Sequence, residues 1–87
     1  MSAASIPIET IPNWAPLEAR LAASLCAEFM WMYRDRGVEH YKHTVTRLYL
    51  LLDASGKCMG RTAAEFYEVP FEEEWKRVSG RVGEQQQ

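Results

Sequence analysis

The chain has 87 residues, of which 47% are hydrophobic and 25% are charged, and its formal net charge is −2. This length allows one domain, and the composition is typical of a folded globular protein rather than a disordered one. The slight acidity argues against a protein that binds nucleic acid over its whole surface.

The two cysteines, Cys26 and Cys58, match neither a zinc-ligand spacing nor the disulfide framework of a small secreted domain. No basic segment followed by a long apolar stretch opens the chain, so we expect no secretory signal peptide. The longest strictly apolar runs, 29–33 and 48–52, are far shorter than the roughly 20 residues of a membrane-spanning helix. The sequence therefore predicts a cytoplasmic location, no membrane partner and reduced cysteines.

In chain order, residues 1–13 contain two prolines and no helical period, and we expect an extended N-terminal arm. A long helix is predicted to begin at Pro16, which suits a first helical position, and to end at Gly37. Its apolar stripe has helical spacing and consists of Leu17, Leu21, Leu25, Phe29 and Met32.

The end of this expected helix, Phe29–Tyr33, is apolar on every face. One sheet cannot cover such a helix from one side, and an apolar surplus of this kind is typical of a protein interface. The alternative is that the N-terminal arm covers it. The interface candidates are Phe29, Met30, Trp31 and Tyr33, together with the apolar residues Tyr49, Leu51 and Met59 on the outer face of the predicted sheet.

The segment 44–52 is β-branched and aromatic and predicts a strand, and Asp53–Gly56 then supplies a hairpin turn. If Asp53 pairs with Lys57, Leu52 lies opposite Cys58 and Leu50 opposite Gly60. A third short strand is expected over 65–69. Pro70 then opens a second helix that Gly80 ends, and residues 81–87 form a flexible tail.

These elements predict a single α+β domain over residues 14–80. Its expected architecture has two layers: a long N-terminal helix packed on a small three-stranded antiparallel sheet, with a short C-terminal helix after it (α-β-β-β-α).

Glu39, His40 and His43 are the only clustered set of possible metal ligands or proton carriers. In a strand, residues three apart point to opposite faces, and Lys42 between the two histidines would repel a cation. Loop histidines bonded to the backbone are the simpler interpretation. We therefore expect no metal, no cofactor and no catalytic residue; a small enzyme or metal-binding protein using His40 and His43 ranks third.

A basic and aromatic sheet face is the remaining candidate site. Nucleobases stack on aromatic side chains while cations meet phosphates in sheet-based nucleic-acid binders. The alternative is that these cations pair with the glutamates of the C-terminal third. The anion or nucleic-acid candidates are Lys42, Arg47, Tyr49, Lys57 and Arg61.

The function expected from the sequence is therefore a small non-catalytic protein-interaction module that self-associates as a homodimer or serves as an accessory to a larger protein. A nucleic-acid-binding domain that uses the sheet face, with Arg47, Tyr49 and Arg61, is the alternative.

Overall fold

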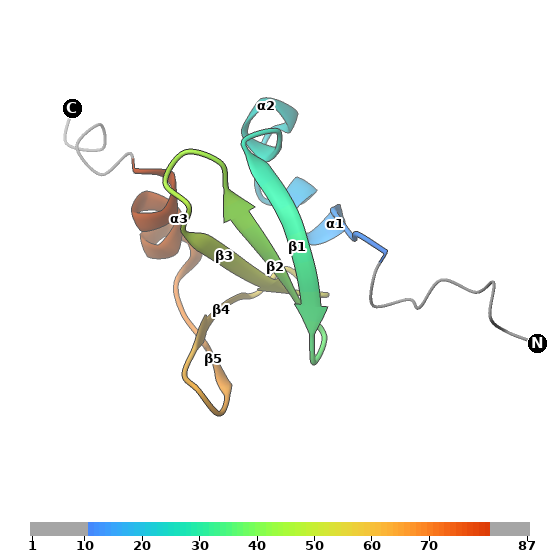
Figure 1. Cartoon of the computed structure of the whole chain (residues 1–87), viewed down its shortest axis with the longest axis vertical. Coiled ribbons are helices and arrows are strands. Elements are labelled where there is room, and N and C mark those ends of the chain that lie inside the picture. The colour runs from blue at the N-terminus through green and yellow to red at the C-terminus, as the bar shows by residue number, and fades with distance from the viewer. Residues whose placement is uncertain (1–10, 81–87) are drawn as a thin grey trace, which may run out of the picture.

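A computed structural model describes residues 11–80, and the expected N-terminal arm and C-terminal tail lie almost wholly outside this range. Five antiparallel strands follow one another in a single sheet in chain order (Figure 1). The strands are β1 (Phe29–Asp35), β2 (Val38–His43), β3 (Tyr49–Asp53), β4 (Cys58–Arg61) and β5 (Phe66–Glu68). The helices are α1 (Ala15–Glu18), α2 (Ala23–Cys26) and α3 (Phe71–Ser79). None of the helices within residues 11–80 has the length and apolar character that crossing a membrane requires.

The predicted long N-terminal helix and three-stranded sheet are wrong. The helical segment breaks after α1, where Ala22 is extended, and α2 ends at Cys26. The apolar block that follows is strand β1, paired with a strand β2 that the sequence analysis did not predict. Arg36 and Gly37 both have positive φ, as a two-residue type I′ hairpin turn requires, so Gly37 turns a hairpin and does not end a helix.

A β-bulge in β1 decides which way its side chains point. Trp31 lies opposite Tyr41 and Tyr33 lies opposite His40, so Met32 is an extra residue. Before the bulge, Phe29 and Trp31 share the face of Tyr41 and pack on the core. After it, Tyr33 shares the opposite face with His40. The bulge therefore re-aims Tyr33 away from the core, as bulges commonly do.

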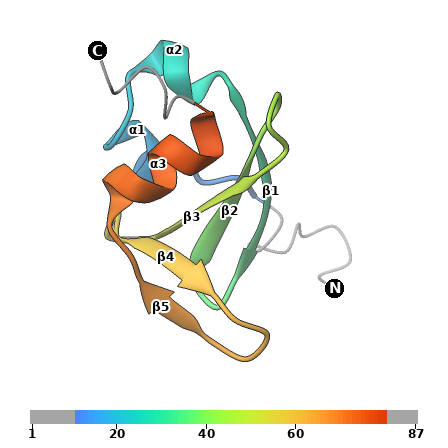
Figure 2. The same ribbon diagram turned by 90° about the vertical axis from the view of Figure 1, so that its left-hand side faces the viewer.

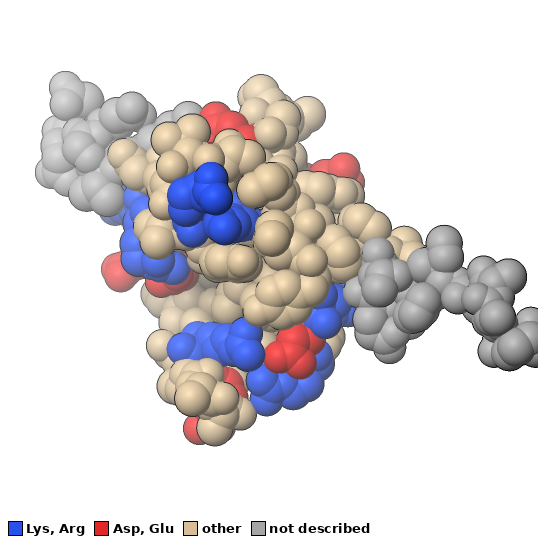
Figure 3. All heavy atoms as spheres, viewed as in Figure 1, with Lys and Arg blue, Asp and Glu red and all other residues tan. Residues whose placement is uncertain are grey.

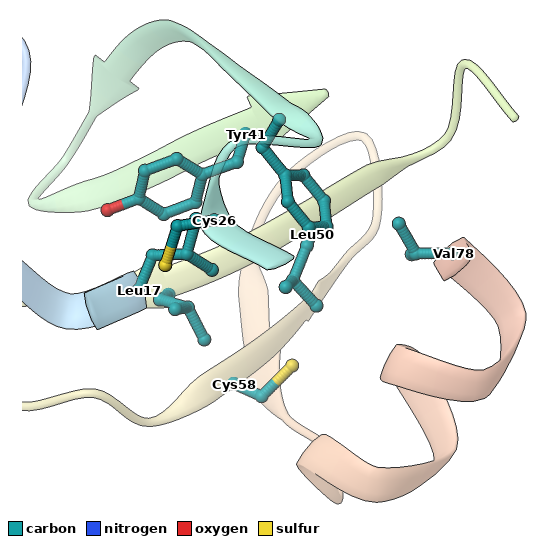
Figure 4. Close-up of a cluster of buried hydrophobic side chains, with 8 residues drawn as sticks. Leu17, Cys26, Tyr41, Leu50, Cys58 and Val78 are labelled. Carbon is teal, nitrogen blue, oxygen red and sulfur yellow. The ribbon is translucent and has the colours of Figure 1, made fainter. Parts of the chain in front are cut away.

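The hydrophobic core lies between the sheet and the three helices (Figure 4). Tyr41, Leu50, Leu52 and Cys58 come from the central strands, and the helices add buried side chains of Leu17, Cys26 and Val78. The buried Tyr41 hydroxyl donates to the Asn13 carbonyl over 2.6 Å, and burial raises the pKa of this phenol. Its polar end is thus satisfied while its ring fills the core.

The expected C-terminal helix is present as α3, with acidic residues in its first turn and a left-handed Gly80 at its end. Its ribbon lies beside α1 and α2 on one side of the sheet (Figure 2). The predicted hairpin is also present: the Asp53 amide donates to the Lys57 carbonyl, and Leu52 lies opposite Cys58. The expected third strand over 65–69 is the last strand, β5.

Candidate functional site

A row of side chains crosses all five strands on the face away from the core. In order of the strands it consists of Tyr33, His40, Leu51, Met59 and Glu68, each lying opposite the next in the sheet register. By the same register, the pair Lys42 and Tyr49 of β2 and β3 and the pair Arg61 and Phe66 of β4 and β5 also lie on this face, next to the row. We call this surface the open face.

A hollow of about 400 Å³ lies on the open face. The ladder between β3 and β4 has only two pairs, Leu51 with Met59 and Leu52 with Cys58, so the predicted pairing of Leu50 with Gly60 is not made. Beyond these pairs the Tyr49 carbonyl accepts from the guanidinium of Arg77 on α3. The two strands thus separate, and the hollow opens between them with α3 at its rim.

Gly60 lies in the wall of the hollow, and its lack of a side chain leaves room for the ring of Tyr67. A Cβ at this position would lie 2.7 Å from two ring carbons of Tyr67, its cross-strand partner on β5. Such a contact forces the ring to move. Glycine therefore permits the close approach of Tyr67 to β4.

His40 lies beneath the open face, with 2% of its surface exposed. Its Nδ1 lies 3.0 Å from the Val38 carbonyl, which can only accept, so Nδ1 carries the proton. Its Nε2 then accepts from Arg61 over 3.2 Å. Burial is the main cause that lowers the pKa of His40, followed in the same direction by the charge of Arg61. The ring is therefore held neutral.

Arg61 joins three strands at the edge of the hollow. Besides His40, its guanidinium donates to the Tyr33 hydroxyl over 3.2 Å and lies 3.6 Å from the Asp35 carboxylate. The Tyr33 ring in turn stacks on His40 with its centroid 4.2 Å away. Hydrogen bonding from Arg36, helped by the charge of Arg61, lowers the pKa of Asp35. The position of Arg61 is thus set by several contacts.

Two further arginines line the hollow. Arg77 donates to Glu74 over 2.6 Å, which balances part of its charge. Arg47 is exposed and has a left-handed backbone with φ of 67°, and within residues 11–80 its side chain has no hydrogen bond or ion pair. The Lys42 ammonium lies 5.8 Å from the centre of the Tyr49 ring. Figure 3 shows Lys and Arg as blue clusters separated mainly by tan surface, with red Asp and Glu atoms beside several of them.

The structure therefore brings most of the predicted anion-binding residues together. Arg47, Tyr49 and Arg61 line the hollow, and Lys42 lies against Tyr49. Lys57 lies elsewhere, in the turn after β3, and does not line the hollow.

The predicted interface residues are divided between the two faces. Tyr33, Tyr49, Leu51 and Met59 line the hollow. Phe29 is buried in the core and Trp31 packs against it. Met30 is 40% exposed, on the strand β1 at the edge of the sheet. The interface residues were predicted from a helix that is apolar on every face, and that helix is not formed.

The possible metal ligands point to different places. Glu39 is buried on the core side, where it accepts from the Trp31 indole over 2.7 Å and from Arg34. His43 Nδ1 accepts backbone N–H groups of Val45 and Thr46, and its Nε2 lies 2.9 Å from Glu28. Within residues 11–80, no group of three or more His, Cys, Asp or Glu side chains is arranged to hold a metal.

The sequence analysis named Tyr33 as an interface candidate on an expected helix, not as a neighbour of the sheet arginines, and it did not name Arg77 as a site residue. Tyr33 reaches the hollow only because of the bulge in β1, and Arg77 only because α3 closes the gap between β3 and β4. No local sequence pattern reveals either contact.

Comparison of the chain with protein-family models, curated proteins and solved structures found no match.

Proposed function

We propose that this chain is a small non-catalytic binding module and that its binding surface is the open face, which takes an anionic partner. One observation carries the proposal: three arginines, Arg47, Arg61 and Arg77, line a single hollow whose wall includes Leu51 and Met59. Ligand sites are commonly concave and largely apolar, with a few polar groups that fix orientation. The positive charges select negative groups on the partner.

Catalysis is less well supported by the same geometry. A general base needs a free lone pair within reach of a substrate proton, and the only unprotonated nitrogen of His40 is occupied by Arg61. The Cys58 thiol points into the core, where burial raises its pKa to about 12, so it is a poor nucleophile. His40 and Cys58 instead contribute to the packing of the sheet.

The test is an NMR titration of the full chain with two polyanions, a polyglutamate peptide and an oligothymidylate. Chemical-shift changes should concentrate at Arg47, Arg61 and Arg77 and disappear at high salt, since exposed charges are screened. Lys57→Ala is the matched control because it removes the same charge outside the hollow, and it should leave the affinity unchanged. The proposal fails if neither polyanion shifts these three residues.

Self-association is the second candidate function, and a specific observation favours it. Strand β1 is an edge of the sheet and exposes Met30, Met32 and Tyr33, so a second copy could pair with it. We rank it second because the bulge at Met32 interrupts that edge. Light scattering at micromolar concentration tests it: a homodimer that Met30→Lys dissociates supports pairing through β1, and a clean monomer excludes it.

A further inference from the structure

We propose that the anionic partner of the open face is a single-stranded nucleic acid, with a base held in the hollow and the flanking phosphates on the surrounding cations. This inference rests on the proposed function and names its ligand class. It follows from the joint placement of aromatic rings, apolar side chains and arginines around one hollow of about 400 Å³.

The shape and chemistry of the hollow fit a base better than a carboxylate side chain. Leu51 and Met59 are apolar, and the rings of Tyr33 and Tyr49 accompany them. A nucleobase is flat and apolar on its faces, and it stacks on tyrosine regardless of its identity. An acidic peptide would pair with the arginines and leave the apolar surface without a partner.

The arrangement of charge also fits a strand with regularly spaced phosphates. The side chain of Arg47, which lines the hollow, has no hydrogen bond or ion pair within the described range 11–80. Arg61 and Arg77 come from β4 and α3, on other parts of the rim, while Lys42 extends the positive charge past Tyr49. The cations are thus spread around the hollow, and a chain crossing it would meet them in succession.

A duplex does not fit this hollow. Its bases are paired and stacked inside the double helix, so no base could enter, and only the phosphate contacts would remain. Single strands, whose bases are free to turn outward, can use both the apolar surface and the cations.

Local carboxylates limit the expected affinity. Glu74 pairs with Arg77, Asp35 lies near Arg61, and Glu68 ends the row of side chains across the open face. Each reduces the attraction for phosphate, and the chain as a whole is acidic. We therefore expect a micromolar complex that is sensitive to salt.

The experiment is fluorescence anisotropy of the full chain with a labelled oligothymidylate of about 20 nucleotides. If about four cations meet phosphates, the logarithm of the affinity should fall with the logarithm of salt concentration with a slope near −3. Between about 50 and 200 mM salt, this slope corresponds to a loss of roughly 50-fold. A salt-independent affinity would overturn the inference.

Two variants separate the contributions of stacking and charge. Tyr49→Ala should weaken binding by roughly 5- to 150-fold, the usual effect of losing one stacked base. Arg47→Gly should weaken binding and reduce the magnitude of the salt slope by about 0.7, whereas Arg47→Lys should keep the slope. Unchanged affinity in both Tyr49→Ala and Arg47→Gly would place the strand elsewhere and overturn the inference.

Three competitors distinguish this ligand from related ones. A duplex of the same length, a mononucleotide and polyglutamate should each displace the labelled strand much less well than unlabelled oligothymidylate does. If polyglutamate competes equally, the proposed function stands and the inference fails. If the duplex or the mononucleotide competes equally, a single-strand site is excluded. If the chain binds neither oligothymidylate nor polyglutamate, both proposals fail together.

Discussion

Arg61 donates a hydrogen bond to Nε2 of His40 across a distance of 3.2 Å, and this contact links the buried part of the open face to its charged rim. The bond requires an unprotonated Nε2, while the Val38 carbonyl requires a proton on Nδ1. A protonated ring would place an N–H against the guanidinium. The position of Arg61 thus depends on a neutral His40.

Stability should therefore decrease on acidification. The pKa of His40 is lowered in the folded chain, so below the ordinary histidine pKa of about 6.5 the unfolded state binds its proton first. The free energy of unfolding falls as the pH decreases from that value towards the folded pKa, by at most about 1.4 kcal/mol per pH unit for this proton. Urea unfolding across this pH range measures the slope.

The matched variant is His40→Gln, which removes the titrating ring. It should lower stability at every pH, because the contact with Tyr33 is lost, but it should flatten the pH dependence. An equally steep dependence in this variant would assign the effect to other groups.

The left-handed backbone of Arg47 predicts a variant that gains stability while losing affinity. A non-glycine residue at φ of 67° is strained, and glycine adopts this conformation without that strain. Arg47→Gly should raise the free energy of unfolding by roughly 0.5–1 kcal/mol. Arg47→Ala removes the same charge but keeps the strain, so it should show no such gain. Thermal unfolding compares the stability of the two variants. Equal stability of both would contradict the prediction that the left-handed backbone of Arg47 is strained.

Glu39 should be essential for stability, although it belongs to no metal site on the described part of the chain. It is 2% exposed and accepts from both the Trp31 indole and Arg34. Glu39→Ala removes the buried carboxylate that accepts these two hydrogen bonds and should cost about 3 kcal/mol. Glu39→Gln retains one oxygen acceptor and should cost less. Urea unfolding followed by tryptophan fluorescence measures the stability of both variants. An equal loss of stability in the two would argue against a contribution of the hydrogen bonds that Glu39 accepts.

The thiols of Cys26 and Cys58 should be reduced and unreactive in the folded protein. Both are buried and free, and burial raises the pKa of each, to about 12 for Cys58. Titration with a thiol reagent should be slow in buffer and complete in urea; a Cys26–Cys58 disulfide would contradict this prediction.

The packing role of Cys58 predicts a cost for a polar replacement. Cys58→Ser places a hydroxyl in the core and should destabilise by about 1–3 kcal/mol. Cys58→Ala introduces no polar group and is the control. If Cys58→Ser is no less stable than Cys58→Ala, the hydroxyl has found a partner.

Trp31→Glu does not test an interface in this fold. It would do so only if Phe29–Tyr33 were an exposed helical block, as the sequence predicted. Because Trp31 packs against the core and donates to Glu39, that substitution would set two carboxylates together beside the core. It would report on folding, so Met30 on the exposed edge is the better position.

Local chemistry was enough to predict the elements whose ends are marked by special residues. Pro70 and Gly80 bound α3 because one suits a helix start and the other adopts the left-handed conformation that ends it. The turn that begins at Asp53 brings Leu52 opposite Cys58, since a short loop determines the register near it. The same register predicted that Tyr49, Leu51, Met59 and Arg61 share a face.

The tertiary structure alone decided the first half of the chain. A short apolar run such as Phe29–Tyr33 has no periodicity that separates helix from strand, and pairing with Val38–His43 across the Arg36–Gly37 turn made it a strand. The bulge at Met32 and the separation of β3 from β4 then formed the hollow. Both depend on contacts between strands and with α3, which local propensity does not encode, and for that reason the residues of the open face were predicted only in part.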